Sequence, residues 1–108
     1  MTDKDSLYRK LYNRSLPFFV WVIEQEPAPF IFKLHIQAMT LKELTITSVR
    51  QSIEVFLNPK QDKVSVQFFA KKKQFKVFVT IKQKADAVSF FERVFRMKEL
   101  TIIDMKEP

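Results

Sequence analysis

Residues 63–84 have the sequence KVSVQFFAKKKQFKVFVTIKQK, with seven lysines and no acidic side chain. Apolar and polar residues alternate on both sides of the central lysine cluster, which is the two-residue period of a β-strand with one face on a core. We therefore predict a β-hairpin with strands Val64–Ala70 and Gln74–Lys82, joined by the four-residue loop Lys71–Gln74.

Strand parity divides this hairpin into an inner and an outer side. Pairing Ala70 with Phe75 places Phe68 inside, where we expect it to be buried, and makes Phe69 and Phe78 diagonal neighbours outside. An outward phenylalanine contributes no core burial. Two of them beside lysines therefore favour a surface on which bases stack.

Positive charge interleaved with aromatic rings suits a nucleic acid, because lysines neutralise phosphates and rings stack on bases. The predicted nucleic-acid-binding residues are five lysines and two phenylalanines of the hairpin: Lys71, Lys72, Lys73, Lys76, Lys82, Phe69 and Phe78. Arg93 and Arg96 extend this surface if their helix ends near the hairpin. Four alternatives stay open, namely a solvated basic surface, a helix that covers the outer side, a dimer interface, and a β-bulge that reverses the parity.

The whole chain, residues 1–108, predicts a single α+β domain. We expect one helix at Thr2–Asn13, which Pro17 prevents from continuing, and another at Ala85–Lys98. The other expected strands are Leu16–Gln25, with Trp21 in the core, then Phe30–Met39, Thr45–Leu57 and Leu100–Met105. Together they predict a mostly antiparallel, strongly bent sheet of five or six strands, or an open β-barrel, with N-terminal and C-terminal helices packed against it.

Composition excludes several classes of site. The chain has no cysteine and no glycine, so it has no disulfide, no Cys-ligated metal and no glycine-rich phosphate loop. One histidine, His35, and scattered carboxylates predict no catalytic residue, no metal site and no small-molecule cofactor, so we expect a protein that is not an enzyme. Neither a membrane span nor a signal peptide is evident, so we expect a cytoplasmic protein.

The net charge of +7 is unevenly spread: residues 1–54 hold seven basic and six acidic side chains, whereas residues 55–108 hold twelve and six. This asymmetry predicts an anionic partner for the second half, most simply RNA or another nucleic acid. The alternative function is a protein-interaction module, a homodimer or a plasmid- or phage-encoded inhibitor. Such a module uses exposed aromatics or an edge strand.

A predicted five-strand run from Leu16 to Lys82, flanked by helices, lies in a small, lysine-rich chain without glycine. In element order, size and basicity the chain resembles compact PUA-like pseudobarrels. More narrowly, it resembles PrgU-type regulators of enterococcal conjugative plasmids. The resemblance implies a PUA-like fold and an RNA-binding regulator that limits the expression of surface adhesins. It assigns no role to individual residues.

Overall fold

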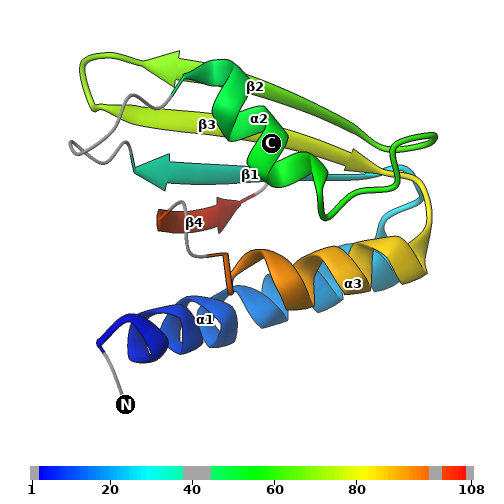
Figure 1. The fold of residues 1–108 in the computed structure, drawn as a ribbon. Coiled ribbons are helices and arrows are strands. Elements are labelled where there is room, and N and C mark those ends of the chain that lie inside the picture. Colours follow the sequence, from blue (N-terminus) through cyan, green and yellow to red (C-terminus); the bar gives the residue numbers. More distant parts are fainter. Residues whose placement is uncertain (1–2, 38–44, 98–100, 107–108) are drawn as a thin grey trace.

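The computed structural model describes residues 3–37, 45–97 and 101–106 (Figure 1). These residues form helices and strands in the order α-β-α-β-β-α-β. The elements are α1 (Asp3–Gln25), β1 (Phe30–Gln37), α2 (Ile46–Glu54), β2 (Lys63–Phe69), β3 (Gln74–Ile81), α3 (Lys84–Val94) and β4 (Thr101–Lys106). None of the helices in these ranges could span a membrane.

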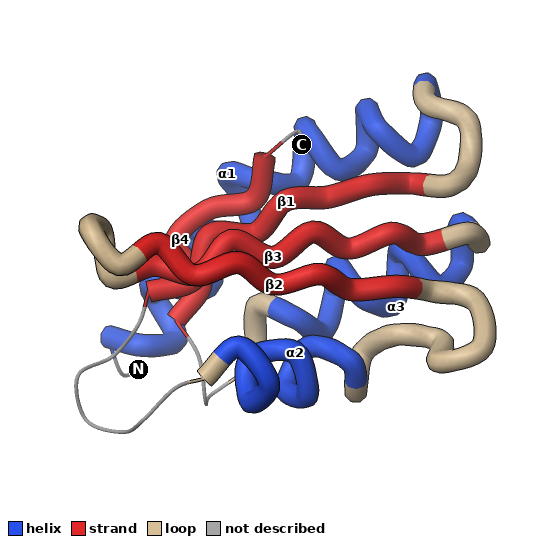
Figure 2. The backbone as a smooth tube through the Cα atoms, turned by 90° about the horizontal axis from the view of Figure 1, so that it is seen from above, coloured by secondary structure: helices blue, strands red, loops and turns tan. Residues whose placement is uncertain are grey.

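The strands make one antiparallel sheet in the order β2-β3-β1-β4, so β3 and β1 are central. Alternate side chains of these two strands are fully buried, among them Phe32, Leu34, Val77 and Val79. In the view from above, α1 and α3 lie behind the sheet and α2 runs beside β2 (Figure 2). The buried side chains therefore point toward the helices, and the core lies between the sheet and the helical layer.

Aromatic rings connect the two longer helices to the sheet. Phe91 of α3 stacks on Phe19 of α1 with ring centroids 4.2 Å apart, and Phe19 stacks on Phe32 of β1 at 5.4 Å. Helix α2 adds Val49 and Ile53 to the same core. One continuous apolar core thus lies on one side of the sheet.

The predicted strand Leu16–Gln25 is wrong, because α1 continues through Pro17 and includes these residues. Proline inside a helix costs about 3 kcal/mol, since it removes one backbone hydrogen bond and crowds the preceding turn. Burial of Phe19 and Val22 stabilises the helix by roughly 1.5–3 kcal/mol each and outweighs that cost. Trp21 lies outside the core with 48% of its surface exposed, so its predicted burial is also wrong.

The predicted strand Thr45–Leu57 is wrong as well, because most of it forms α2. Thr45 and Ser48 make a reciprocal capping box: each side-chain oxygen accepts a hydrogen bond from the other residue's backbone N–H, at 3.0 and 2.9 Å. The two buried residues, Val49 and Ile53, are four residues apart, which is helical spacing. The cap and this spacing prevail over the high β-branched content of the segment.

The α+β class is confirmed, but the described sheet is open and has four strands instead of five or six. A PUA-like barrel is therefore not confirmed. The predicted strand Phe30–Met39 corresponds to β1, the predicted helix Ala85–Lys98 to α3, and the predicted strand Leu100–Met105 to β4. Residues 38–39, 98 and 100 of these segments, and Thr2 of the first helix, lie outside the described ranges.

Candidate nucleic-acid interface

The side chains that point away from the helices form what we call the outer face of the sheet. The hairpin β2–β3 contributes Lys63, Ser65, Gln67, Phe69, Gln74, Lys76, Phe78 and Thr80; β1 and β4 contribute Ile31, Lys33, His35, Gln37, Thr101, Asp104 and Lys106. Each of these side chains is exposed or half-buried. No helix in the described ranges crosses this face (Figure 2), so the sheet itself is open to a partner.

The hairpin has the predicted parity, because Phe69 and Phe78 both lie on the outer face. The predicted register, in contrast, is wrong by two residues. Phe68 pairs with Phe75, where we expected Ala70 to do so. A shift of two residues preserves which side chains point outward, and it changes only which of them lie opposite one another.

The new register separates the two outer rings. Phe69 lies opposite Gln74, and Phe78 lies four residues further along β3, about 13 Å away at strand spacing. The expected diagonal contact between the rings is therefore wrong. The cause is the turn at Ala70–Lys73, in which Lys73 takes a left-handed φ of 51°. Glycine usually marks such a position, and this chain has none.

Lys76 lies against Phe69 on the outer face. Its ammonium nitrogen is 4.1 Å from the centroid of the Phe69 ring, at cation–π distance. The ring is 38% exposed. Lys76 therefore occupies one surface of this ring, and the pair presents a positive charge above an aromatic ring to a partner.

Phe78 is the outer ring at the middle of the sheet. Its cross-strand neighbours are Ser65 on β2 and Lys33 on β1, and it is half-buried. Across the sheet the ring therefore has a small hydroxyl on one side and a long cationic side chain on the other. Phe78 thus combines a central position with a nearby positive charge, which is what stacking of a nucleotide requires.

The predicted lysines fall into two groups. Lys71, Lys72 and Lys73 are exposed in the turn at one end of the hairpin, and the Gln37 side chain donates a hydrogen bond to the carbonyl of Lys73 at 3.3 Å. Lys82 follows β3 at its other end, roughly 30 Å from the turn at strand spacing. The structure thus places Lys82 apart from the loop lysines.

Two further predictions, the burial of Phe68 and the extension of the basic surface by Arg93, concern residues on the helical side of the sheet. Phe68 points inward and contacts Phe75 at 4.8 Å, but it is 45% exposed because it lies at the end of an edge strand. Its predicted burial is wrong. Arg93 lies over the ring of Phe56 at 5.3 Å, beside α2, and therefore does not extend the outer face.

The sheet order brings together charged residues that the sequence analysis did not combine. β1 lies between β3 and β4, so Lys33 is opposite Lys106, and His35 is flanked by Lys76 and Asp104. Alternation along residues 30–39 already indicated that Lys33 and His35 share the polar side of their strand. The pairing of β1 with β4 carries no comparable local signal.

The surroundings of His35 change its acidity. Burial lowers its pKa from 6.5, and the positive charges of Lys33, Lys106 and Lys76 lower it further, while Asp104 acts in the opposite direction. These surroundings favour the neutral form of the ring. Its Nε2 atom is buried and has no hydrogen-bond partner.

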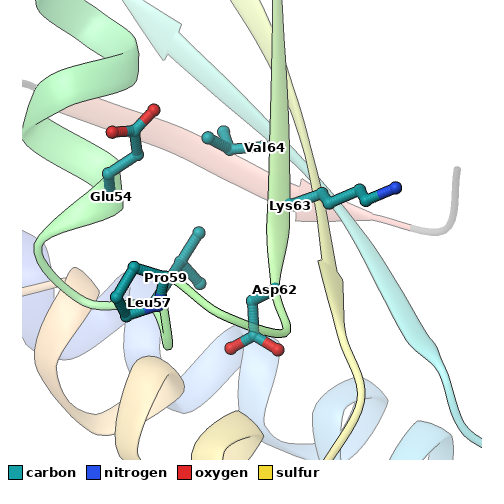
Figure 3. Close-up of a pocket in the computed structure, with 6 residues that line it drawn as sticks. All are labelled: Glu54, Leu57, Pro59, Asp62, Lys63 and Val64. Carbon is teal, nitrogen blue, oxygen red and sulfur yellow. The ribbon is translucent and has the colours of Figure 1, made fainter.

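A shallow pocket lies between the end of α2 and the start of β2. It is lined by Glu54, Leu57, Pro59, Asp62, Lys63 and Val64 (Figure 3). The Asp62 carboxylate is occupied in two backbone hydrogen bonds, from Asn58 at 3.0 Å and Lys82 at 3.1 Å. These hydrogen bonds hold the connection between α2 and β2 in place beside the end of β3. A structural role therefore accounts for the Asp62 carboxylate in this pocket.

Within the described ranges, no group of three or more His, Asp or Glu side chains is arranged to hold a metal ion. The outer face of the sheet combines exposed lysines with two half-exposed rings, and it is the candidate site. No protein-family model, curated protein or solved structure matches the chain.

Proposed function

We propose that the chain is a non-enzymatic regulatory protein of the cytoplasm that binds single-stranded RNA on the outer face of its sheet. The observation that carries the proposal is an uncovered sheet face with a ring at its centre and lysines on all sides. The regulatory role is the part that the likeness to PrgU-type regulators implies.

The charge of the outer face supports a polyanionic partner. Four lysines lie on it, Lys33, Lys63, Lys76 and Lys106, against one carboxylate, Asp104. The three lysines of the β2–β3 turn lie at one end of the same face. Release of counterions from a bound strand provides a sequence-independent part of the affinity at such a surface.

The two outer rings favour a single strand over a duplex. Bases of a single strand are free to stack on Phe78, whereas paired bases expose only their edges. The spacing of about 13 Å between Phe69 and Phe78 leaves room for the strand to pass over Gln67 and Lys76 between them. We therefore expect contact with several successive nucleotides across β3.

A salt titration tests the role of the lysines. Replacing Lys71, Lys72 and Lys73 with Ala is expected to flatten the slope of log K against log salt by about 2, because each phosphate contact to a single strand contributes about 0.7. Binding of single-stranded RNA pools is measured by fluorescence anisotropy around physiological salt. The matched control removes three exposed lysines away from the outer face, Lys10→Ala, Lys60→Ala and Lys84→Ala.

The control variant is expected to keep the wild-type slope much more closely than the turn variant. Equal binding by wild type and the turn variant contradicts a role for the turn lysines. Absence of binding by wild type to both single-stranded and structured RNA contradicts the proposed function.

The same titration separates stacking from charge. Phe78→Ala is expected to weaken binding by about 1–3 kcal/mol at every salt concentration and to leave the slope unchanged, because stacking releases no counterions. Phe68→Ala removes an exposed ring on the helical side and serves as the control. If both variants bind as wild type does, the outer rings do not stack on bases.

A second candidate function, self-association, is favoured by a separate observation. Val20 and Trp21 on α1 are 36% and 48% exposed, and neither points into the core. Helical periodicity aligns them with Lys10, Pro17 and Glu24 along one side of α1. A second copy that packs antiparallel across Pro17 brings Lys10 of one chain opposite Glu24 of the other, which supplies charge complementarity.

A further inference from the structure

The middle of the outer face, where β3, β1 and β4 lie side by side, concentrates positive charge around one histidine. His35 on β1 is opposite Lys76 on β3 and Asp104 on β4. Lys33, the preceding outward residue of β1, is opposite Lys106. Lysines from three strands therefore lie around His35, although the ammonium nitrogen of Lys76 is directed toward Phe69 on β2, 4.1 Å from the centroid of that ring.

The one carboxylate of this cluster does not balance its charge. Asp104 makes an ion pair with Lys106 at 3.4 Å and a longer one with Arg14 of α1 at 4.0 Å. Within the described ranges, Lys33 and Lys76 make no ion pair with a carboxylate. The centre of the face therefore holds an excess of positive charge beside a neutral ring.

The His35 ring has unused hydrogen-bonding capacity. Its Nε2 atom is buried and unpartnered in this structure, although the side chain as a whole is only half-buried. An imidazole with an unpartnered nitrogen, on a face with lysines from three strands, is suited to an anion that both accepts hydrogen bonds and carries negative charge. Because Nε2 is buried, the anion reaches it only when the ring or a neighbouring side chain changes rotamer. A phosphodiester of an RNA strand has these properties.

We propose that Lys33, His35 and Lys106, with Lys76 at the margin beside Phe69, form a subsite for one phosphate of the bound strand, and that His35 takes up a proton when this phosphate binds. The inference rests on the proposed function and adds to it a defined anchoring point. The physical reason is that the phosphate charge offsets the repulsion from the lysines, so the charged imidazolium becomes favourable.

Proton uptake links affinity to pH. Histidine is the side chain whose charge ordinarily changes between about pH 5 and 8. The other charged groups at this part of the face are Lys33, Lys76, Lys106, Asp104 and Arg14. His35 is then the group at this subsite that titrates. Affinity for RNA is expected to rise as pH falls through this range, by at most about tenfold if the pKa of His35 rises by about one unit on binding.

The chain offers an unusually direct measurement, since His35 is its only histidine. Its ring carbon and proton resonances are followed by NMR against pH for the free protein, with inorganic phosphate, and with a single-stranded oligoribonucleotide. Both anions are expected to raise the pKa of His35, and the oligonucleotide more than free phosphate. Sodium chloride at matched ionic strength is the control, because general screening of the lysines also raises this pKa.

Variants separate the subsite from the rest of the surface. His35→Gln is expected to bind RNA with an affinity that no longer changes between pH 8 and 5.5. Lys33→Ala is expected to raise the pKa of His35 in the free protein and to reduce its response to the oligonucleotide. Lys60→Ala, an exposed lysine outside the sheet, is expected to behave as wild type.

The outcomes distinguish the two proposals. If RNA binds and the pKa of His35 does not move beyond the sodium chloride control, the phosphate subsite is wrong and RNA binding stands. If inorganic phosphate raises the pKa beyond that control and RNA does not bind, the subsite stands as an anion site and the proposed function is wrong. If RNA does not bind and neither anion raises the pKa of His35 beyond the sodium chloride control, both proposals are wrong.

Discussion

Phe91 is the residue at which α1 and α3 pack together. It is 1% exposed, and its ring centroid lies 4.2, 4.9 and 5.0 Å from those of Phe19, Tyr12 and Phe95. Phe91→Ala is therefore expected to lower the free energy of unfolding by about 3–5 kcal/mol, measured by urea denaturation. Phe68→Ala, which truncates a ring that is 45% exposed, is expected to cost clearly less. Equal losses contradict this description of the core.

His35 makes a separate contribution to stability as a function of pH. Because its pKa in the folded protein is below 6.5, the unfolded chain takes up the proton first as pH falls. The free energy of unfolding therefore decreases from about pH 6.5 down to the folded-state pKa, and is unaffected above 6.5. In urea melts, wild type is expected to lose more stability than His35→Gln between about pH 7.5 and 5.5. An identical loss contradicts the lowered pKa.

At the scale of elements, the connection from α2 to β2 depends on Asp62. Its carboxylate accepts the N–H of Asn58 and the N–H of Lys82, and so joins this connection to the end of β3. Asp62→Ala removes both hydrogen bonds, each worth about 0.5–1.5 kcal/mol, and is expected to cost about 1–3 kcal/mol in urea denaturation. Glu92→Ala, an exposed carboxylate on α3, is the matched control and is expected to be nearly neutral. A neutral Asp62→Ala contradicts this role.

The elements that sequence reasoning identified are those with a strong local period. Strand alternation at residues 30–37 and 63–81 and the apolar stripe of α3 predict β1, the hairpin and α3. The second half of α1 was missed because Pro17 and a continuous apolar run indicate a strand locally, whereas burial of Phe19 and Val22 decides the helix. α2 was missed because its capping box uses Ser48 where the sequence signature has Glu or Gln, so the cap is evident only from the hydrogen bonds between Thr45 and Ser48.

The candidate site was predictable to the same extent. Parity placed Phe69, Phe78 and Lys76 on one outer face, because parity depends only on alternation within a strand. The register of the hairpin and the position of His35 between Lys76 and Asp104 depend on a turn without glycine and on long-range pairing. Neither has a signature in the local sequence, so both required the three-dimensional structure.

At the scale of the whole molecule, the two exposed surfaces have different chemistry. The outer face carries lysines around a ring, so a second copy with the same net charge of +7 is repelled there. The exposed side of α1 carries apolar side chains, Val20 and Trp21, between a basic and an acidic residue. The proposed RNA binding and the proposed self-association would therefore use separate surfaces, and a variant on one is expected to leave the other intact.

Self-association through α1 is expected to require opposite charges at positions 10 and 24. In the antiparallel arrangement, Lys10 of each copy faces Glu24 of the other, and a contact of one helix with one helix is small, so the dimer is expected to be weak. Sedimentation velocity is expected to show dimer that increases with protein concentration and is lost in Trp21→Ala. Lys10→Glu is expected to abolish it by repulsion, and the double variant Lys10→Glu with Glu24→Lys to restore it. A strict monomer at high concentration excludes the arrangement, and a dimer that survives Trp21→Ala places its interface elsewhere.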